Sequence, residues 1–127
     1  MAVEDLISDL EKAEAGNRLW DGPIGLVVGW KRKVEYIKAD GNESARKVIW
    51  FLPDGSEGRV PNFTSSLDAA LLLARTVAPN DVWGVSYAAG RGTAMIGNMR
   101  YSEAATPALA LCIAALRLKI GRADLDE

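Results

Sequence analysis

Residues 105–121 read Ala-Thr-Pro-Ala-Leu-Ala-Leu-Cys-Ile-Ala-Ala-Leu-Arg-Leu-Lys-Ile-Gly, and they contain a helix start signal, an apolar face and a stop signal. Thr106 is a suitable N-cap, because its side-chain oxygen can accept a hydrogen bond from a free amide, and Pro107 suits the first helical position. Gly121 is expected to end the helix in the left-handed conformation. Because only two residues inside the segment are charged, we expect a helix that is buried over most of its circumference.

Other segments supply elements against which this helix can pack. Apolar residues at helical spacing predict an amphipathic helix over residues 3–15. A second helix is expected from the capping residue Asn17 onward, interrupted or restarted at Gly22-Pro23. A third is expected to begin at the cap Ser65, with an acidic residue three positions later, and to end near Val77.

Residues 33–38 and 46–52 are rich in β-branched and aromatic types and predict an antiparallel strand pair. The sequence 53–56 (Pro-Asp-Gly-Ser) predicts a turn after them, followed by a short extended piece at Arg59-Val60. A second hairpin is expected from strands at 82–87 and 93–100. The order of elements predicts one domain over residues 1–127, an α+β fold layered as an α/β/α sandwich, with a mostly antiparallel sheet of about four strands and three to four helices.

Composition bounds the setting in which this chain functions. A domain of 127 residues can bury a core without metals or disulfides, and the single cysteine, Cys112, lies within the apolar helix segment. The chain begins with acidic residues where a signal peptide needs a positive segment, and no run reaches the length of a membrane span. We therefore expect a cytoplasmic protein with no membrane association.

The absence of histidine removes the commonest general base, the Ser-His-Asp and Cys-His arrangements, and most zinc sites. Four acidic residues in the two turn regions could offer oxygen ligands to magnesium, but residues of this kind usually form turns or face solvent; they are Asp40, Glu43, Asp54 and Glu57. The glycines of residues 88–93 lack the phosphate-binding patterns and predict a hairpin turn. We expect no enzyme activity, no cofactor and no metal site, and interpret Cys112 as a core residue.

The chain is mildly basic between its acidic ends. Residues 15–123 hold nine acids and fourteen bases, a balance of +5, although the net charge of the whole chain is −2. Lys31, Arg32 and Lys33 follow Trp30. This combination is typical of nucleic-acid contacts, since basic side chains bind phosphates and aromatic rings stack on nucleobases. Arg91, in the second hairpin, is a further candidate contact. The alternative interpretation is that Trp30 belongs to the core and that the basic run protects a strand edge.

Two segments resemble a known family of small phage and prophage proteins, the phage ABA sandwich family. They are Pro61-Asn-Phe-Thr-Ser-Ser-Leu-Asp-Ala-Ala-Leu71 and Ala105-Thr-Pro-Ala-Leu-Ala-Leu-Cys-Ile-Ala-Ala-Leu116. The segment at residues 17–21 (Asn-Arg-Leu-Trp-Asp) is also similar to a segment found in family members. The resemblance implies an α/β/α layered fold and a phage gene of uncharacterised function expressed in the cytoplasm of a bacterial host. It carries over no catalytic residue.

Two functions follow as hypotheses. The first is a non-enzymatic phage or prophage accessory protein that binds a host or phage protein through an exposed sheet edge or hairpin. The alternative is binding of a nucleic acid or nucleotide through the basic central region. Self-association stays open beside both, because an open sheet edge can pair with a second copy and form a homodimer.

Overall fold

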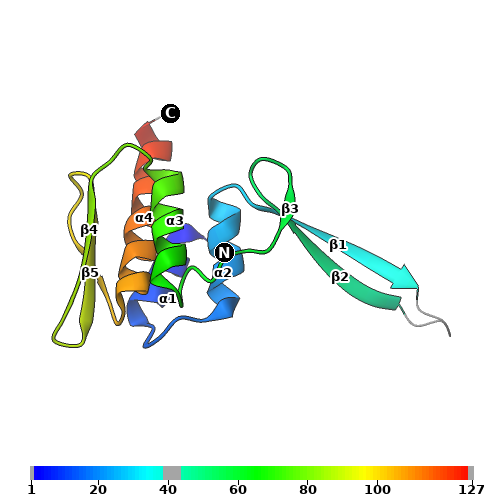
Figure 1. The fold of residues 1–127 in the computed structure, drawn as a ribbon, viewed down its shortest axis with the longest axis horizontal. Coiled ribbons are helices and arrows are strands. Elements are labelled where there is room, and N and C mark those ends of the chain that lie inside the picture. Colours follow the sequence, from blue (N-terminus) through cyan, green and yellow to red (C-terminus); the bar gives the residue numbers. More distant parts are fainter. Residues whose placement is uncertain (1, 39–43, 126–127) are drawn as a thin grey trace.

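The computed structural model describes residues 2–38 and 44–125, which form an α+β fold (Figure 1). The helices and strands follow one another along the chain as α1 (Val3–Lys12), α2 (Arg18–Val27), β1 (Lys31–Lys38), β2 (Ser44–Phe51), β3 (Glu57–Gly58), α3 (Leu67–Val77), β4 (Trp83–Ala88), β5 (Arg91–Ile96), β6 (Ser102–Ala104) and α4 (Pro107–Leu125). The α+β class, the antiparallel pairing and the number of helices agree with the prediction. The strands differ in number, because they form two sheets of three strands, in the orders β1-β2-β3 and β4-β5-β6.

Helix α4 is the centre of the molecule. It packs against α1, α3 and the sheet β4-β5-β6, and the helices lie between that sheet and the strands β1 and β2 (Figure 1). Residues 108–116 of α4 are all buried, so the expectation of a helix covered around most of its circumference is confirmed. Thr106 caps it as predicted, accepting a hydrogen bond from the Leu109 amide at 3.2 Å. No described helix is long and apolar enough to cross a membrane.

Several element boundaries differ from the sequence-based expectation. Helix α4 continues through Gly121 to Leu125, because a glycine costs a helix interior only about 1 kcal/mol and the residues that follow are mostly good helix formers. The cap of α3 is Ser66, not Ser65, since Ser66 is extended and its side chain accepts from the Ala69 amide at 3.3 Å. Helix α1 ends at Lys12, three residues earlier than predicted.

Helix α2 runs through Gly22-Pro23 without a break, contrary to the predicted interruption. Proline disfavours helical geometry partly through a clash of its ring with the Cβ of the preceding residue, and Gly22 has no Cβ. Gly22 also makes room for the Trp50 ring, because a Cβ at this position would lie 3.2 Å from Trp50 Cζ2. The glycine therefore serves both the helix and the packing of β2 against it.

The second sheet also departs from prediction at its turns. The hairpin between β4 and β5 turns at Ala89 and Gly90, whose φ angles of 53° and 76° are those of a two-residue turn. Arg91 and Gly92 consequently belong to β5. Strand β5 ends at Ile96, where Gly97 has a φ of 59°, and the chain returns as β6, which was not predicted. In the first sheet, the extended piece after the turn is Glu57–Gly58 instead of residues 59–60.

Candidate functional site

Strands β1 and β2 form a two-stranded ribbon that projects away from the helices (Figure 1). Eight residues of each strand pair, from Lys31 opposite Phe51 to Lys38 opposite Ser44, so the ribbon is about 26 Å long at 3.3 Å per residue. Sheet β4-β5-β6, in contrast, lies on the other side of the helices. The ribbon is thus the most prominent exposed feature of the described chain.

The register assigns the side chains of the ribbon to two faces, because alternate residues of a strand point to opposite sides. One face, here called the arginine face, carries Arg32, Val34 and Tyr36 from β1 and Arg46, Val48 and Trp50 from β2. Tyr36 is 73 % exposed and lies opposite Arg46, while Arg32 lies opposite Trp50. The arginine face has no acidic residue among its described side chains.

The other face, here called the lysine face, carries Lys31, Lys33 and Lys47 together with Glu35. Lys33 Nζ lies 3.3 Å from Glu35 Oε1, so one lysine is already paired with the one described acid of the ribbon. Lys31, Arg32, Arg46 and Lys47 are exposed and have no described ion pair. Five cationic side chains and one carboxylate are described on the ribbon, and they make it a strongly positive element on a chain whose net charge is −2.

Of the five predicted contact residues, three lie on the ribbon, Trp30 lies at its root and Arg91 lies apart from them. Lys31, Arg32 and Lys33 lie on the ribbon, where pairing adds Arg46 and Lys47, which the sequence analysis did not single out. Trp30 is instead half-buried at the root of the ribbon and faces Gly25 of α2, where an added Cβ would lie 3.4 Å from Trp30 Cβ and Cγ. Trp30 therefore packs against α2, in line with the alternative interpretation, and its role as a nucleic-acid contact stays a prediction.

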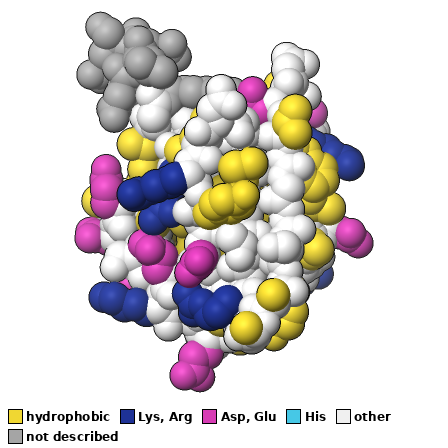
Figure 2. All heavy atoms as spheres, turned by 90° about the vertical axis from the view of Figure 1, so that its left-hand side faces the viewer, with side chains coloured by type: hydrophobic (Ala, Val, Ile, Leu, Met, Phe, Trp, Pro, Cys, Tyr) yellow, Lys and Arg dark blue, Asp and Glu magenta, His cyan; other side chains and the backbone are white. Residues whose placement is uncertain are grey.

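Arg91 is exposed at the start of β5, on the side of the molecule away from the ribbon (Figure 1). On that side, acidic and basic side chains are interspersed with hydrophobic ones (Figure 2). Arg91 therefore does not join the basic ribbon. The pairing of β1 with β2 was predictable, but the register that places Arg46 beside Tyr36 required the structure.

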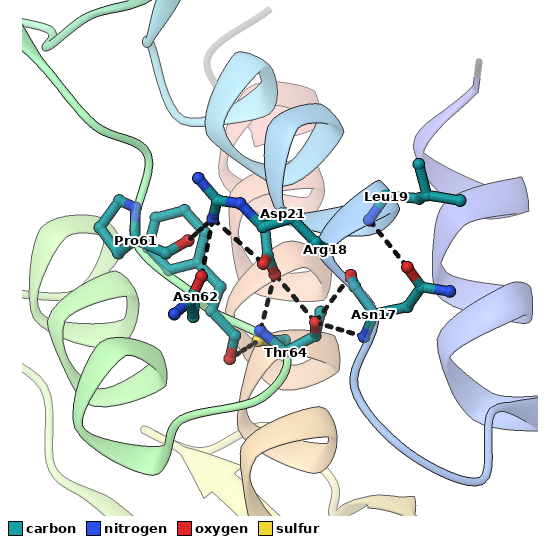
Figure 3. Close-up of polar contacts among 9 residues, drawn as sticks. Asn17, Arg18, Leu19, Asp21, Pro61, Asn62 and Thr64 are labelled. Atoms are coloured by element: carbon teal, nitrogen blue, oxygen red, sulfur yellow. Dashed lines mark hydrogen bonds and ion pairs between the residues drawn. The ribbon is translucent and has the colours of Figure 1, made fainter.

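A buried polar network joins the two chain segments that flank the ribbon. The Asp21 carboxylate in α2 is 0 % exposed, and its Oδ1 accepts from the Thr64 amide at 2.9 Å and lies 2.8 Å from the Thr64 hydroxyl (Figure 3). Arg18 extends the network, because its guanidinium lies 3.2 Å from Asp21 Oδ2 and donates to the Pro61 carbonyl and to Asn62 Oδ1 at 3.0 Å. Helix α2 precedes the ribbon and residues 61–64 follow it, so the network fixes both segments to each other.

Cys112 belongs to the same buried region and has no catalytic geometry. Its Sγ donates to the Phe63 carbonyl at 3.2 Å, and the residue is 0 % exposed. Burial raises the pKa of the Cys112 thiol far above its ordinary value, and the Asp21 carboxylate raises it further. The thiol therefore stays protonated, and its interpretation as a core residue is confirmed.

The carboxylates considered as metal ligands do not form a site in the described residues. Asp54 accepts from the Ser56 amide at 2.8 Å and from the Ser56 hydroxyl at 2.6 Å, and these hydrogen bonds lower its pKa. This is the arrangement of a turn-forming aspartate. Asp40 and Glu43 lie outside the described residues. Within residues 2–38 and 44–125, no three His, Cys, Asp or Glu side chains are grouped so that they could hold a metal ion.

An apolar cavity of about 150 Å³ lies at the root of the ribbon. Its lining includes Trp30, Leu52 and Phe63, together with Thr76. The Thr76 hydroxyl donates to the Leu72 carbonyl at 2.8 Å, so it is engaged within its own helix. No charged side chain lines the cavity, so the cavity has no group that could act as a general acid or base.

Comparison with known proteins adds no relative: no family model matches the chain, and no curated protein or solved structure does so. The resemblance to the phage ABA sandwich family stays a prediction.

Proposed function

We propose that the protein binds double-stranded DNA by placing the β1–β2 ribbon in a groove of the duplex. The observation that supports this most is the arginine face, where Arg46 lies opposite exposed Tyr36, Arg32 lies nearer the root, and no described acid lies beside them. A two-stranded ribbon has the width that the major groove of B-form DNA admits, whereas the deep, narrow major groove of RNA helices excludes side chains.

The energetics of a ribbon also favour a binding role. A two-stranded hairpin is only marginally stable alone in water, because it buries little surface. Val48 is 42 % exposed on the arginine face and Tyr36 is 73 % exposed, so the ribbon gains little from packing on the helices beyond its root. A ligand that covers the arginine face would supply the missing contacts.

Acidic residues elsewhere would orient the complex. Glu4, Asp5, Asp9 and Glu11 are exposed on α1, whose one described base is Lys12. Phosphates are repelled by such a helix and attracted by the ribbon, so the charge distribution favours approach of DNA from the ribbon side. Contacts of this kind position a protein on DNA without reading its sequence. We therefore expect binding with little sequence preference.

Fluorescence anisotropy with a labelled DNA duplex at low salt tests the proposal. Arg32→Glu with Arg46→Glu should weaken binding about tenfold or more, because both cations leave the arginine face. Arg75→Glu with Arg91→Glu is the matched control, since it makes the same change of charge at two exposed arginines outside the ribbon. Circular dichroism would verify that both variants are folded.

Three outcomes would contradict the proposal. The wild type would bind no duplex at low salt, the two double variants would lose affinity equally, or an RNA duplex would bind as tightly as DNA. The hypothesis that the ribbon docks on a host or phage protein predicts the first of these outcomes. If affinity depended only on the net charge of the protein, the two double variants would lose affinity equally.

A further inference from the structure

Strand β4 forms one edge of the sheet β4-β5-β6, and among the described residues nothing pairs with its outer side. Gly97 donates its amide to the Val82 carbonyl at 2.6 Å, which fixes the phase of the ladder between β4 and β5. In an antiparallel pair, hydrogen-bonded and non-hydrogen-bonded residues alternate. Gly84, Ser86 and Ala88 therefore bond to β5, whereas Trp83, Val85 and Tyr87 direct their backbone groups to the free edge.

This edge lacks the features that normally prevent strands from pairing. Residues 82–90 read Val-Trp-Gly-Val-Ser-Tyr-Ala-Ala-Gly and contain neither a charged residue nor a proline. Charged side chains and prolines are the usual protection of an exposed edge. Strand β1, the edge of the other sheet, has such protection in its lysines and arginine. The edge strand β1 therefore has charged side chains that hinder pairing, whereas the edge strand β4 has none.

The side chains along the free edge are apolar and incompletely covered. Trp83, Val85 and Tyr87 are alternate residues of β4, so their side chains lie on the same face of the sheet. This face also carries the buried side chains of Ala94 and Ile96. Trp83 and Val85 are only partly buried there, and Tyr87 is 62 % exposed. Val82, just before the strand, is 81 % exposed. A partner that extends the sheet would cover this row.

We propose that a second copy of the chain pairs with β4 in antiparallel orientation, with the two-fold axis at Val85. Val85 then lies opposite Val85 of the second copy, and Trp83 lies opposite its Tyr87. Each of these pairs presents its free N–H and C=O groups to the other, so each exchanges two hydrogen bonds. The aromatic pair adds the kind of cross-strand contact that stabilises sheets. No like charges meet, because the strand carries none.

The dimer has a consequence for the ribbon. Pairing of β4 with β4 of the second copy would join the two sheets into one continuous sheet. The two-fold axis of such a dimer runs perpendicular to that sheet. The ribbon projects from the helix side of the sheet (Figure 1), so both ribbons of the dimer would extend to the same side. The dimer itself does not depend on DNA binding and is tested without DNA.

Light scattering coupled to size exclusion tests the oligomeric state, and the expected mass is twice the 13.7 kDa of one chain. Val85→Cys tests the register, because residues paired in this way have Cα atoms about 5.5 Å apart, within the range of a disulfide. Mild oxidation should crosslink this variant into a dimer. Ser86→Cys is the matched control, since Ser86 is displaced by two residues from its own counterpart and the two Cα atoms lie beyond about 7 Å, too far for a disulfide.

A monomeric wild type at high protein concentration would overturn the proposal. So would efficient crosslinking of the Ser86→Cys variant, because it would place the axis at Ser86. Both cysteine variants alter exposed or partly buried positions by small volumes, and a thermal melt would establish that each is folded. Cys112 is buried and should not take part in the crosslink.

Discussion

Replacing Asp21 by alanine should destabilise the fold strongly, because this carboxylate is 0 % exposed and accepts hydrogen bonds from Thr64. The Thr64 hydroxyl keeps the Asn17 carbonyl as an acceptor at 3.1 Å, so the Thr64 amide is the donor left without a partner. A buried unsatisfied amide costs about 1–3 kcal/mol. The lost pair with Arg18, which is 45 % exposed, contributes no more than about 1 kcal/mol. We therefore expect Asp21→Ala to lower the free energy of unfolding by about 2–4 kcal/mol.

Two further variants make this prediction specific. Asp21→Asn keeps an oxygen acceptor for the Thr64 amide but turns an NH2 group toward the Arg18 guanidinium in place of Oδ2, so it should cost about 1–2 kcal/mol, less than Asp21→Ala. Asp9→Ala removes an exposed carboxylate from α1 and should change stability by less than about 0.5 kcal/mol. Urea unfolding, followed by circular dichroism and tryptophan fluorescence, measures all three. The reasoning would be refuted if Asp21→Ala cost no more than Asp9→Ala.

Three other predictions concern the ribbon, the core and the thiol. Tyr36→Ala should weaken duplex binding by less than about threefold, because stacking on a ring contributes mainly to single-stranded binding; a tenfold loss on the duplex would show that Tyr36 contacts bases. Leu109→Ala, at a position that is 0 % exposed in α4, should lower the free energy of unfolding by about 2–5 kcal/mol in urea titrations. Cys112 should not react with a thiol reagent until the protein unfolds. Because its pKa is raised in the folded state, the associated stability is complete below the unfolded value near 9.0 and declines at higher pH. Cys112→Ala should remove this decline, as unfolding between pH 8 and about 10 would show.

Local signals were predictable from the sequence, and long-range arrangements were not. The start of α4 followed from Thr106 and Pro107, since capping depends on neighbouring residues. Its end did not, because a glycine ends a helix only where the chain must change direction, and α4 continues beyond Gly121. The assignment of strands to two sheets depends on contacts between distant segments, which apolar periodicity does not encode.

The candidate site shows the same division. Lys31, Arg32 and Lys33 are adjacent in sequence and were identified as a basic run. Arg46 joined them only through the strand register, which places it opposite Tyr36. For Trp30 the sequence left two interpretations open, because an aromatic residue beside basic residues has the same sequence signature whether it stacks on a base or packs on a helix. The structure shows Trp30 packed beside Gly25 of α2.

The salt dependence of DNA binding tests the central claim most directly. Four exposed cations on the ribbon have no described ion pair, so one ribbon should give a slope of log K against log salt of about −3.6, and two ribbons of a dimer about −7. For one ribbon, affinity should fall roughly 150-fold between 50 and 200 mM salt. In the Arg32→Glu, Arg46→Glu variant, the slope should become less negative by about two for each ribbon. A wild-type slope between 0 and about −1, or one that this variant leaves unchanged, would contradict binding through the ribbon.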